Sequence, residues 1–305
     1  MKILITADTH YRAGSDVATG VEKCFYDAKA KFGFVDMLVI AGDIAESIQN
    51  FENHRLFFRF AKKVFPESEI CFCAGNHDIW MIENDDGSRV DSLQILTEVL
   101  PDIAKSEGVN FLEGENIFEH KGFTLVGTLG FYDYSLAKPD LSLFGEKVTE
   151  KHYRAKIPPK GSAPTWNDVF IEWDFADDKV ACEFILQNFE KGLKKAVLRG
   201  LPILSISHCV PFSCANAWAS LDTGWREFYN AFAGSKKLGE IHLANNKSGL
   251  IKYQVSGHTH RLARCKKAGI KFVNIGSTYG RLNFLLLEFV DNDFKEIVFH
   301  IDPRD

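Results

Sequence analysis

The stretch Glu69-Ile70-Cys71-Phe72-Cys73-Ala74-Gly75-Asn76-His77-Asp78 decides the fold, because it joins a short apolar run to a cluster of polar side chains. The apolar run has the length of a buried strand, and Gly75 marks the turn that ends it. Asn76, His77 and Asp78 are therefore expected just beyond the carboxyl end of a strand. In an open α/β sheet ligands bind at this edge, since the loops that leave it converge on one crevice.

The same arrangement occurs four more times along the chain. Runs at residues 1–7, 36–41, 201–207 and 252–256 are mostly rich in Val, Ile and Leu, and each precedes a residue type that binds metals. With Asn76, the candidate ligands are Asp8, His10, Asp43, His208, His258 and His260. Seven protein ligands are too many for one ion. They suit two ions that share a bridging carboxylate and leave room for water and substrate.

The ligand types narrow the choice of metal. The set offers carboxylate oxygen, amide oxygen and imidazole nitrogen, and it contains no thiolate. Such mixed sites suit Mn, Fe or Zn, whereas a structural zinc site more often uses cysteine. We therefore expect two divalent ions, with Mn first and Fe or Zn as alternatives.

The spacing of the ligands predicts how they act together. Asp8 and His10 are two residues apart, so on an extended backbone both side chains point to the same side and grip one ion. His258 and His260 have the same spacing, but a turn at the strand end would let the two imidazoles serve neighbouring ions. Glycines precede several of these ligands, which permits a tight backbone close to a metal.

These five segments, in this order, resemble the signature of the calcineurin-like metallophosphoesterase superfamily. Its pattern is D-x-H, G-D, G-N-H-D, a lone H, and G-H-x-H, and here it spans residues 8–260. The resemblance implies that Asp8, His10 and His260 hold one ion, that Asn76, His208 and His258 hold the second, and that Asp43 bridges them. It also implies hydrolysis of a phosphate ester by a hydroxide that bridges the metals.

Two residues of the third motif are predicted to act in catalysis rather than as ligands. In the family pattern His77 is no ligand, so we expect it to protonate the leaving alkoxide or to stabilise the transition state. Asp78 is expected to orient His77. The histidines outside the motifs are interpreted as structural; they are His54, His120, His152, His242 and His300.

The second motif disfavours two branches of the superfamily. Protein Ser/Thr phosphatases extend it to G-D-x-V-D-R-G, whereas here Gly42-Asp43 is followed by Ile44-Ala45-Glu46-Ser47. Purple acid phosphatases place a Tyr three residues after the Asp, where this chain has Glu46. Two alternatives to a general phosphoesterase stay open, a metal-dependent nuclease and a non-catalytic metal-binding scaffold of the same fold.

Composition bounds the remaining functional classes. The chain has 305 residues, 46% of them hydrophobic, and no run of 18 apolar residues, so a membrane span is not expected. A net charge of −5 with dispersed basic residues does not favour a nucleic-acid partner. The seven cysteines are odd in number and contain no C-x-x-C pair, so a disulfide framework is not expected and the cytoplasm is the default location. The natural substrate, the preference for monoesters or diesters, and the oligomeric state stay open.

The pattern along the chain predicts one α/β domain over residues 1–305. Helices are expected at 22–31, 53–64, 90–105, 179–199 and 225–244, and hairpin strands at 111–112, 117–120, 123–129, 262–267, 270–275, 282–289 and 297–301. Turns are expected at Lys121-Gly122, Ala268-Gly269 and Asp291-Asn292. The family fold agrees, as a layered α/β/β/α sandwich of two mixed sheets flanked by helices, with the metal site at the carboxyl ends of strands. Residues 132–176 are rich in proline and aromatics and lack periodicity. We expect an inserted cap that shapes substrate choice, and the alternative is a surface insertion packed elsewhere.

Overall fold

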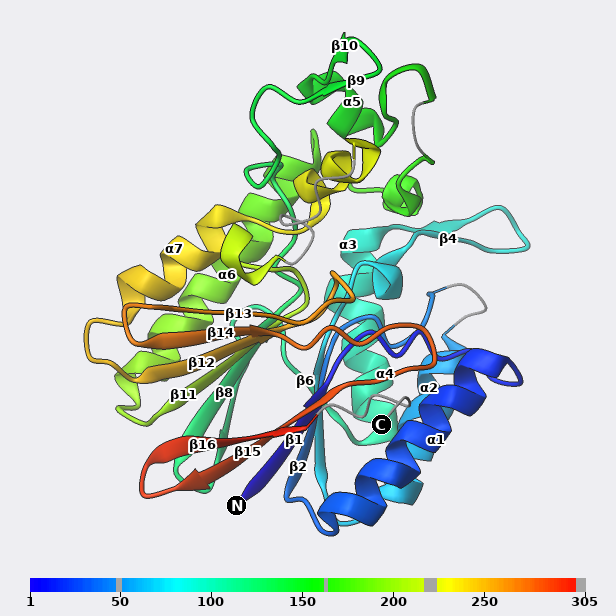
Figure 1. The fold of residues 1–305 in the computed structure, drawn as a ribbon. Coiled ribbons are helices and arrows are strands. Elements are labelled where there is room, and N and C mark those ends of the chain that lie inside the picture. Colours follow the sequence, from blue (N-terminus) through cyan, green and yellow to red (C-terminus); the bar gives the residue numbers. More distant parts are fainter. Residues whose placement is uncertain (48–50, 162–163, 217–223, 300–305) are drawn as a thin grey trace.

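Two six-stranded mixed sheets stack face to face in the computed structural model (Figure 1), which describes residues 1–47, 51–161, 164–216 and 224–299. The first sheet has the order β16 (Asp293–Phe299), β15 (Phe284–Val290), β1 (Lys2–Thr6), β2 (Met37–Ala41), β3 (Glu69–Cys73), β6 (Asn110–Phe111). The second has the order β13 (Ala263–Lys267), β14 (Ile270–Asn274), β12 (Ile251–Ser256), β11 (Ile203–Ser207), β8 (Phe123–Thr128), β7 (Ile117–His120).

The ligand-bearing strands run parallel within each sheet. β1, β2 and β3 are parallel neighbours in the first sheet, as are β11 and β12 in the second. Antiparallel strands β15 and β16 form one edge of the first sheet, and β7 and β13 form both edges of the second. The other edge of the first sheet is β6, which is parallel to β3. Parallel neighbours end on the same side, so the loops that follow these strands emerge together.

A shared core holds the sheets together. Side chains of the inner faces, such as Ile5 and Val39 from the first sheet and Leu204 and Val255 from the second, are fully buried in one cluster. The outer faces pack against helices (Figure 1). α1 (Asp16–Phe32), α2 (Glu52–Val64) and α4 (Leu100–Glu107) lie on the first sheet, and α6 (Asp178–Leu198) and α7 (Lys236–Asn245) on the second. The expected layered sandwich of two mixed sheets is confirmed.

Two predicted helices are interrupted. The predicted helix at 90–105 begins only at Ser92 and consists of α3 (Ser92–Gln94), the π-helical turn η2 (Ile95–Val99) and α4. The interruption arises because Pro101, in the first turn of α4, has no N–H to donate to a regular helix. Residues 225–244 divide into the 3-10 helix η7 (Gly224–Phe232) and α7. Between them Gly234 pairs with Val210, so close that a Cβ would lie 2.0 Å from the Val210 carbonyl oxygen.

The three predicted hairpin turns form where they were expected. Lys121-Gly122, Ala268-Gly269 and Asp291-Asn292 all have positive φ, as two-residue turns between antiparallel strands require. The last strand begins at Asp293, earlier than predicted, because the turn leads into it directly. The predicted end of that strand, at residues 300–301, lies outside the described residues.

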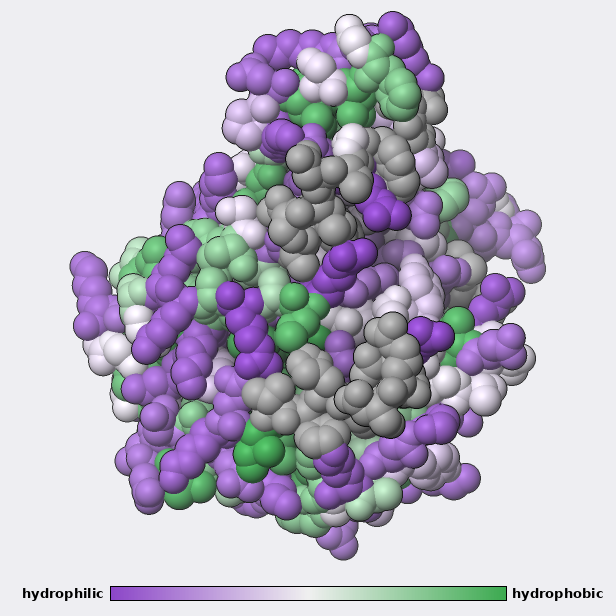
Figure 2. Space-filling view, viewed as in Figure 1, coloured by the Kyte–Doolittle hydropathy of each residue, from purple (hydrophilic) through white to green (hydrophobic). Residues whose placement is uncertain are grey.

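Residues 132–176 form a lobe beyond the strand ends (Figure 1), together with η7. The segment contains β9 (Ser142–Leu143), β10 (Glu146–Lys147), α5 (Glu150–Ala155), η3 (Pro159–Gly161) and η4 (Asn167–Phe170). Its buried aromatic side chains belong to the large cluster that also contains the outer helices, and the Tyr153 ring stacks on Phe228 of η7 with centroids 5.1 Å apart. The surface of the lobe mixes hydrophobic residues with hydrophilic ones (Figure 2). Nearby, the hairpin of β4 (Ile82–Glu83) and β5 (Arg89–Val90) lies at the same end of the molecule.

One pair of cysteines differs from the expectation. Cys214, in η5 (Ser213–Ala215), forms a disulfide with Cys265 in β13, with Cα atoms 5.9 Å apart. The two residues are 51 positions apart in the chain and lie in no recognisable motif, so only the folded structure brings them together. Cys71 and Cys73 alternate along β3 and share its buried inner face.

Candidate metal centre

The predicted ligands gather at the edge of the sandwich where strands of both sheets end. In the first sheet Asp8 and His10 follow β1, Asp43 follows β2, and Asn76 follows β3 just before η1 (His77–Ile79). In the second sheet His208 follows β11, while His258 and His260 follow β12. All are buried except His260, which is half-buried. The structure therefore brings all the predicted ligand residues to one place.

Five of these residues have a left-handed backbone. φ is 53° at Asp8, 42° at His10, 51° at Asp43, 72° at His258 and 52° at His260. The expectation of an extended backbone through Asp8 and His10 is therefore wrong, because β1 ends at Thr6 and a turn, not strand alternation, aims both side chains at the site. Such a conformation costs about 1–3 kcal/mol per residue and persists only where surrounding contacts hold it. Backbone bonds from Asp8 to Gly42 and from His10 to Asp43, both 3.0 Å, provide such contacts.

Two glycines let the ligand loops approach closely. A Cβ at Gly42 would lie 2.5 Å from Nδ1 of His208, and one at Gly75 would lie 2.1 Å from Oδ1 of Asp43. Gly42 also has a φ of 79°, which favours glycine. A side chain at Gly42 would push the loops of the two sheets apart, and one at Gly75 would push apart the loops after β2 and β3 of the first sheet.

The first group of ligand atoms comes from Asp8, His10, Asp43 and His260, within 4.8 Å of one another. Nε2 of His10 lies 3.2 Å from Nε2 of His260 and 3.6 Å from Oδ2 of Asp43. Nε2 of His260 lies 3.5 Å from Oδ1 of Asp8. Ligand atoms held at about 2.1 Å from one ion are separated by roughly 3 Å at right angles, so these spacings suit a shared ion.

The second group comes from Asp43, His208 and His258, with Asn76 beside them. Nε2 of His208 lies 2.9 Å from Oδ1 of Asn76, 3.1 Å from Nδ1 of His258 and 3.2 Å from Oδ2 of Asp43. The same oxygen of Asp43 therefore faces both groups, as a bridging carboxylate would. His258 and His260 lie in different groups despite their spacing of two residues.

Hydrogen bonds orient the imidazoles toward these groups. Nδ1 of His208 bonds to the Ala41 carbonyl oxygen at 2.9 Å, and Nε2 of His258 bonds to the Phe232 carbonyl oxygen at 3.0 Å. Each ring thus donates through one nitrogen and presents the other to the site, the usual arrangement of a metal-binding histidine. Oδ2 of Asp8 is buried and has no hydrogen-bond partner among the described residues. The residues present therefore fit a pair of divalent ions.

The charges of the site agree with this arrangement. Burial lowers the pKa of His258 to about 3, helped by the nearby His208, so its ring is neutral and can coordinate. Burial also lowers the pKa of His208, but the Asp43 carboxylate outweighs it and raises the pKa to about 9. Without a metal, His208 and Asp43 thus form a buried ion pair. A divalent ion would take the place of the proton.

His77 lies beside the groups without belonging to either one. Its ring centroid is 4.7 Å from that of His10 and 4.1 Å from that of Trp80, and its Nδ1 has no hydrogen-bond partner among the described residues. The backbone N–H of His77 donates to Oδ1 of Asp43 at 2.9 Å. This imidazole is therefore held beside the first group with a ring nitrogen left for another partner.

The prediction that Asp78 orients His77 is not met, because the Asp78 carboxylate bonds to other groups. Its Oδ1 accepts from the backbone N–H groups of Ile44 and Ala45 and lies 2.9 Å from Nε2 of His54, and its Oδ2 accepts from the Gly75 N–H at 2.7 Å. The turn of η1 directs Asp78 inward, where it ties the loops after β2 and β3 together. The structure thus gives Asp78 and His54 a role in holding these loops.

Sequence patterns missed two further residues at the site. Tyr279 stacks on His10 with ring centroids 4.2 Å apart, and Asp168 accepts a hydrogen bond from the amide of Asn76 at 2.7 Å. Neither belongs to a motif. Asp168 lies in the inserted segment, whose lack of periodicity gives no signal for a single buried carboxylate.

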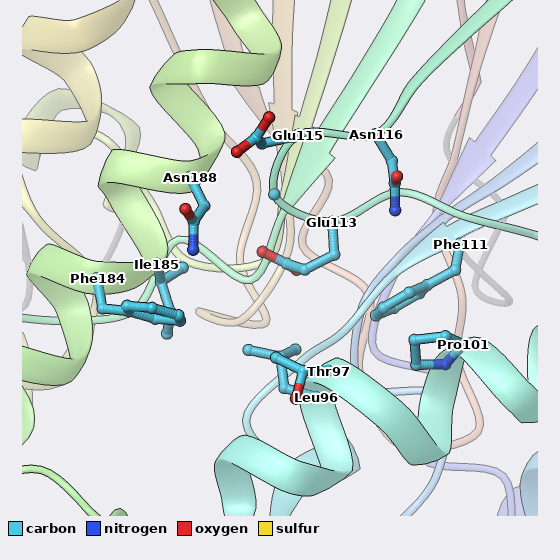
Figure 3. Close-up of a pocket in the computed structure, with 11 residues that line it drawn as sticks. Leu96, Thr97, Pro101, Phe111, Glu113, Glu115, Asn116, Phe184, Ile185 and Asn188 are labelled. Atoms are coloured by element: carbon cyan, nitrogen blue, oxygen red, sulfur yellow. The ribbon is translucent and has the colours of Figure 1, made fainter.

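A hollow of about 200 Å³ adjoins the first group and is lined by His10, Arg12, Glu46 and Tyr279, among others. The Arg12 side chain forms no ion pair with any described residue. A separate hollow of about 360 Å³ lies between α6 and the η2–α4 helices, where the Glu113 carboxyl group points inward (Figure 3). That hollow contains no candidate ligand. Of these two hollows, only the first adjoins the candidate ligands.

The chain belongs to the calcineurin-like phosphoesterase family, whose model matches residues 1–262. It is a hydrolase that acts on phosphoric ester bonds, and the family typically uses a pair of divalent metals. A comparison with curated proteins gave no match. None of the described helices has the length and apolar character needed to cross a bilayer.

Solved structures with the same fold cover nearly the whole chain. A phosphopantetheinyl hydrolase from Mycobacterium tuberculosis aligns with a TM-score of 0.64 and 17% identity, over 100% of this chain and 97% of that one. The protein TT1561 of Thermus thermophilus aligns with a TM-score of 0.52 and 12% identity, over 97% and 98%. A dimetal phosphatase from Danio rerio aligns with a TM-score of 0.51 and 16% identity, over 97% and 95%. At these identities the likeness shows the fold alone.

Proposed function

We propose that the chain hydrolyses a phosphodiester or phosphomonoester at a centre of two divalent ions, with Mn expected first and Fe or Zn as alternatives. One ion would be held by Asp8, His10 and His260, the other by Asn76, His208 and His258, with Asp43 shared. The shared oxygen of Asp43 carries this proposal, because it lies 3.6 Å from a ligand nitrogen of one group and 3.2 Å from a ligand nitrogen of the other. Two such ions supply a hydroxide nucleophile near neutral pH and neutralise charge on the phosphoryl oxygens.

His77 is proposed as the general acid. It borders the first group, it is not needed as a ligand, and its Nδ1 is buried without a partner among the described residues. An imidazole there can give its proton to the leaving oxygen of the ester. The Trp80 ring packed at 4.1 Å limits the movement of His77, and so holds it in place.

Residues 132–176 are proposed as a cap that shapes substrate choice. The segment contacts the loop after β3, where the Met81 N–H donates to the Phe170 carbonyl oxygen at 2.9 Å. Phe170 also packs on Trp80 with centroids 5.5 Å apart, and its side chain is half exposed. We also propose the cytoplasm as the location. Reducing conditions there would open the Cys214–Cys265 disulfide, which would form again on oxidation in air.

Hydrolysis of matched aryl esters tests the function. Protein stripped with chelator and reloaded with Mn²⁺ is assayed against an aryl phosphodiester and the corresponding monoester, beside Asp43→Asn. We expect turnover that requires metal and that the substitution abolishes, since Asn lacks the charge needed to share two ions. The preferred ester defines the substrate class. No turnover by protein that holds two ions would contradict the proposal and favour the scaffold alternative.

The same assay tests the cap. Phe170→Ala should change the ratio of activities on small and large esters, and an unchanged ratio would remove the cap proposal.

A DNA-binding measurement tests the nuclease alternative. A nuclease would bind DNA with an affinity that falls steeply with salt. The dispersed basic residues lead us to expect no such binding.

A further inference from the structure

Asp168, in η4 of the inserted segment, is fully buried next to the second ligand group. Its carboxylate accepts three hydrogen bonds from N–H groups. Oδ1 accepts from Nδ2 of Asn76 at 2.7 Å and from Nε1 of Trp80 at 3.2 Å, and Oδ2 accepts from Nε1 of Trp166 at 2.7 Å. One carboxylate thus joins the inserted segment to the loop after β3.

The bond to Asn76 determines which way its amide points. Nδ2 donates to Asp168, so the carbonyl end faces the opposite way, with Oδ1 2.9 Å from Nε2 of His208. Only the amide oxygen can bind a metal, because the amide nitrogen has no free lone pair. Asp168 therefore selects the orientation of Asn76 in which it can act as a ligand.

The charge of Asp168 has no cationic side chain to balance it. All three donors are neutral, and no ion pair among the described residues includes Asp168. Burying a carboxylate costs several kcal/mol unless an opposite charge or several hydrogen bonds compensate it. A divalent ion held by Asn76, His208 and His258 would supply that charge.

The two indoles bound to Asp168 flank the site. Trp80 packs on His77 at 4.1 Å, and Trp166 meets the ring of His258 edge-on at 6.0 Å. Trp166 also stacks on Phe232, with centroids 5.4 Å apart. The Asp168 carboxylate thus holds both indoles in place beside the candidate ligands.

We infer that Asp168 is a positioning residue through which the inserted segment and an ion in the second group stabilise each other. The inference rests on the proposed metal centre. Because coupling between two binding events is reciprocal, docking of the segment strengthens metal binding, and metal binding holds the segment in place. The segment is thereby a part of the metal centre as well as a neighbour of the substrate.

Titration with Mn²⁺ alone tests this inference. In Asp168→Asn one of the two sites should bind Mn²⁺ about 10- to 100-fold more weakly than in the wild type, the usual effect of removing the partner of a ligand. At limiting Mn²⁺ the wild type should give the EPR spectrum of a coupled Mn pair, whereas Asp168→Asn should give the spectrum of a single ion. Mn²⁺ should slow proteolysis within residues 132–176 in the wild type and much less in the variant.

Two variants and a melting curve separate positioning from mere packing. Asp140→Asn removes the same charge from an exposed carboxylate in the same segment, and it should bind both ions like the wild type. Trp166→Phe removes one donor to Asp168 but leaves the bond to Asn76, and it should also keep both ions. Metal-free Asp168→Asn should melt somewhat lower than the metal-free wild type, because the NH2 of Asn faces an N–H donor where the carboxylate accepted a hydrogen bond. Its gain in Tm on adding Mn²⁺ should also be smaller, so the deficit in Tm should be larger with metal than without.

Wild-type affinity at both sites of Asp168→Asn would overturn the inference, as would an equal loss of Tm with and without metal. This failure is distinct from failure of the proposed function. If the wild type binds two ions tightly but hydrolyses no ester, the proposed function is wrong. The Mn²⁺ titration would still decide whether metal binding and docking of the inserted segment are coupled.

Discussion

The two sheets contribute different chemistry to the candidate metal centre. The first sheet supplies every candidate oxygen ligand, Asp8, Asp43 and Asn76, and one candidate imidazole, His10. The second sheet supplies only candidate imidazoles, His208, His258 and His260. Neither sheet holds a complete group, since each group combines ligands from both. The centre therefore exists only when the inner faces of the sheets pack together, and metal binding reports on that packing.

Among the residues compared between the two sheets, His77, which follows β3 of the first sheet, should give the largest effect on substitution. His77→Ala should lower kcat for an alkyl ester about 10²- to 10⁴-fold, the usual contribution of a general acid. The loss should be much smaller for a nitrophenyl ester, because its leaving oxygen needs no proton. The ratio of the two losses serves as an internal control, since a general disturbance of the metals would lower both rates alike. Equal losses would remove the general-acid role.

The second-sheet side carries a cross-link that the first sheet lacks within the described residues. The Cys214–Cys265 bond joins the segment after His208 to the strand after His260 and closes a loop of 51 residues. In the loop-entropy model such a bond stabilises by about 4 kcal/mol, so a reductant should lower Tm and the urea midpoint. The double variant Cys214→Ser/Cys265→Ser should not respond to reductant. Free thiols at both cysteines in air-oxidised protein would contradict this prediction.

A smaller effect is expected from His242, which ties α7 to β11 in the second sheet. The buried ring lies 2.7 Å from the Leu238 carbonyl oxygen through Nδ1 and 2.8 Å from Ser205 Oγ through Nε2, and burial lowers its pKa to about 4. Below pH 6.5 the unfolded chain takes up a proton that the folded one does not, so stability present at neutral pH is lost as the pH falls toward 4. The loss from this group is about 3 kcal/mol.

Urea unfolding of metal-free protein at several pH values measures that loss. His242→Gln is unable to take up the proton, so its unfolding free energy should fall less between pH 6.5 and 4 than that of the wild type. The other histidines are common to both proteins, and their contributions cancel in the difference. Parallel curves for the two proteins would show that His242 is not the source.

Much of the fold could be predicted because its patterns are local. The period-two hairpins and their turns at Lys121-Gly122 and Ala268-Gly269 form where they were expected, since each depends only on neighbouring residues. The interrupted helices could not be read in this way. Pro101 produces a π-helical turn, and Gly234 stops a helix because Val210, distant in sequence, pairs with it.

The site shows the same division. Residue type and position after a strand were enough to select the residues that gather at the sheet edge. The partners of Asp78 were not predictable, because the turn of η1 aims its carboxylate at His54 and the loop after β2. Asp168 was also hidden, since its importance comes from three donors that meet only in the folded chain.

The sequence by itself determined the chemistry of this protein: which oxygen and nitrogen ligands are available, and that each follows a strand. Strand patterns and ligand types are properties of short segments, so they can be read without the fold. Only the tertiary structure decided which ligands share a group, that Oδ2 of Asp43 faces both, and that Asp168 holds Asn76. Those relations join residues up to 250 positions apart, such as His10 and His260, and depend on strand register and on the packing of two sheets.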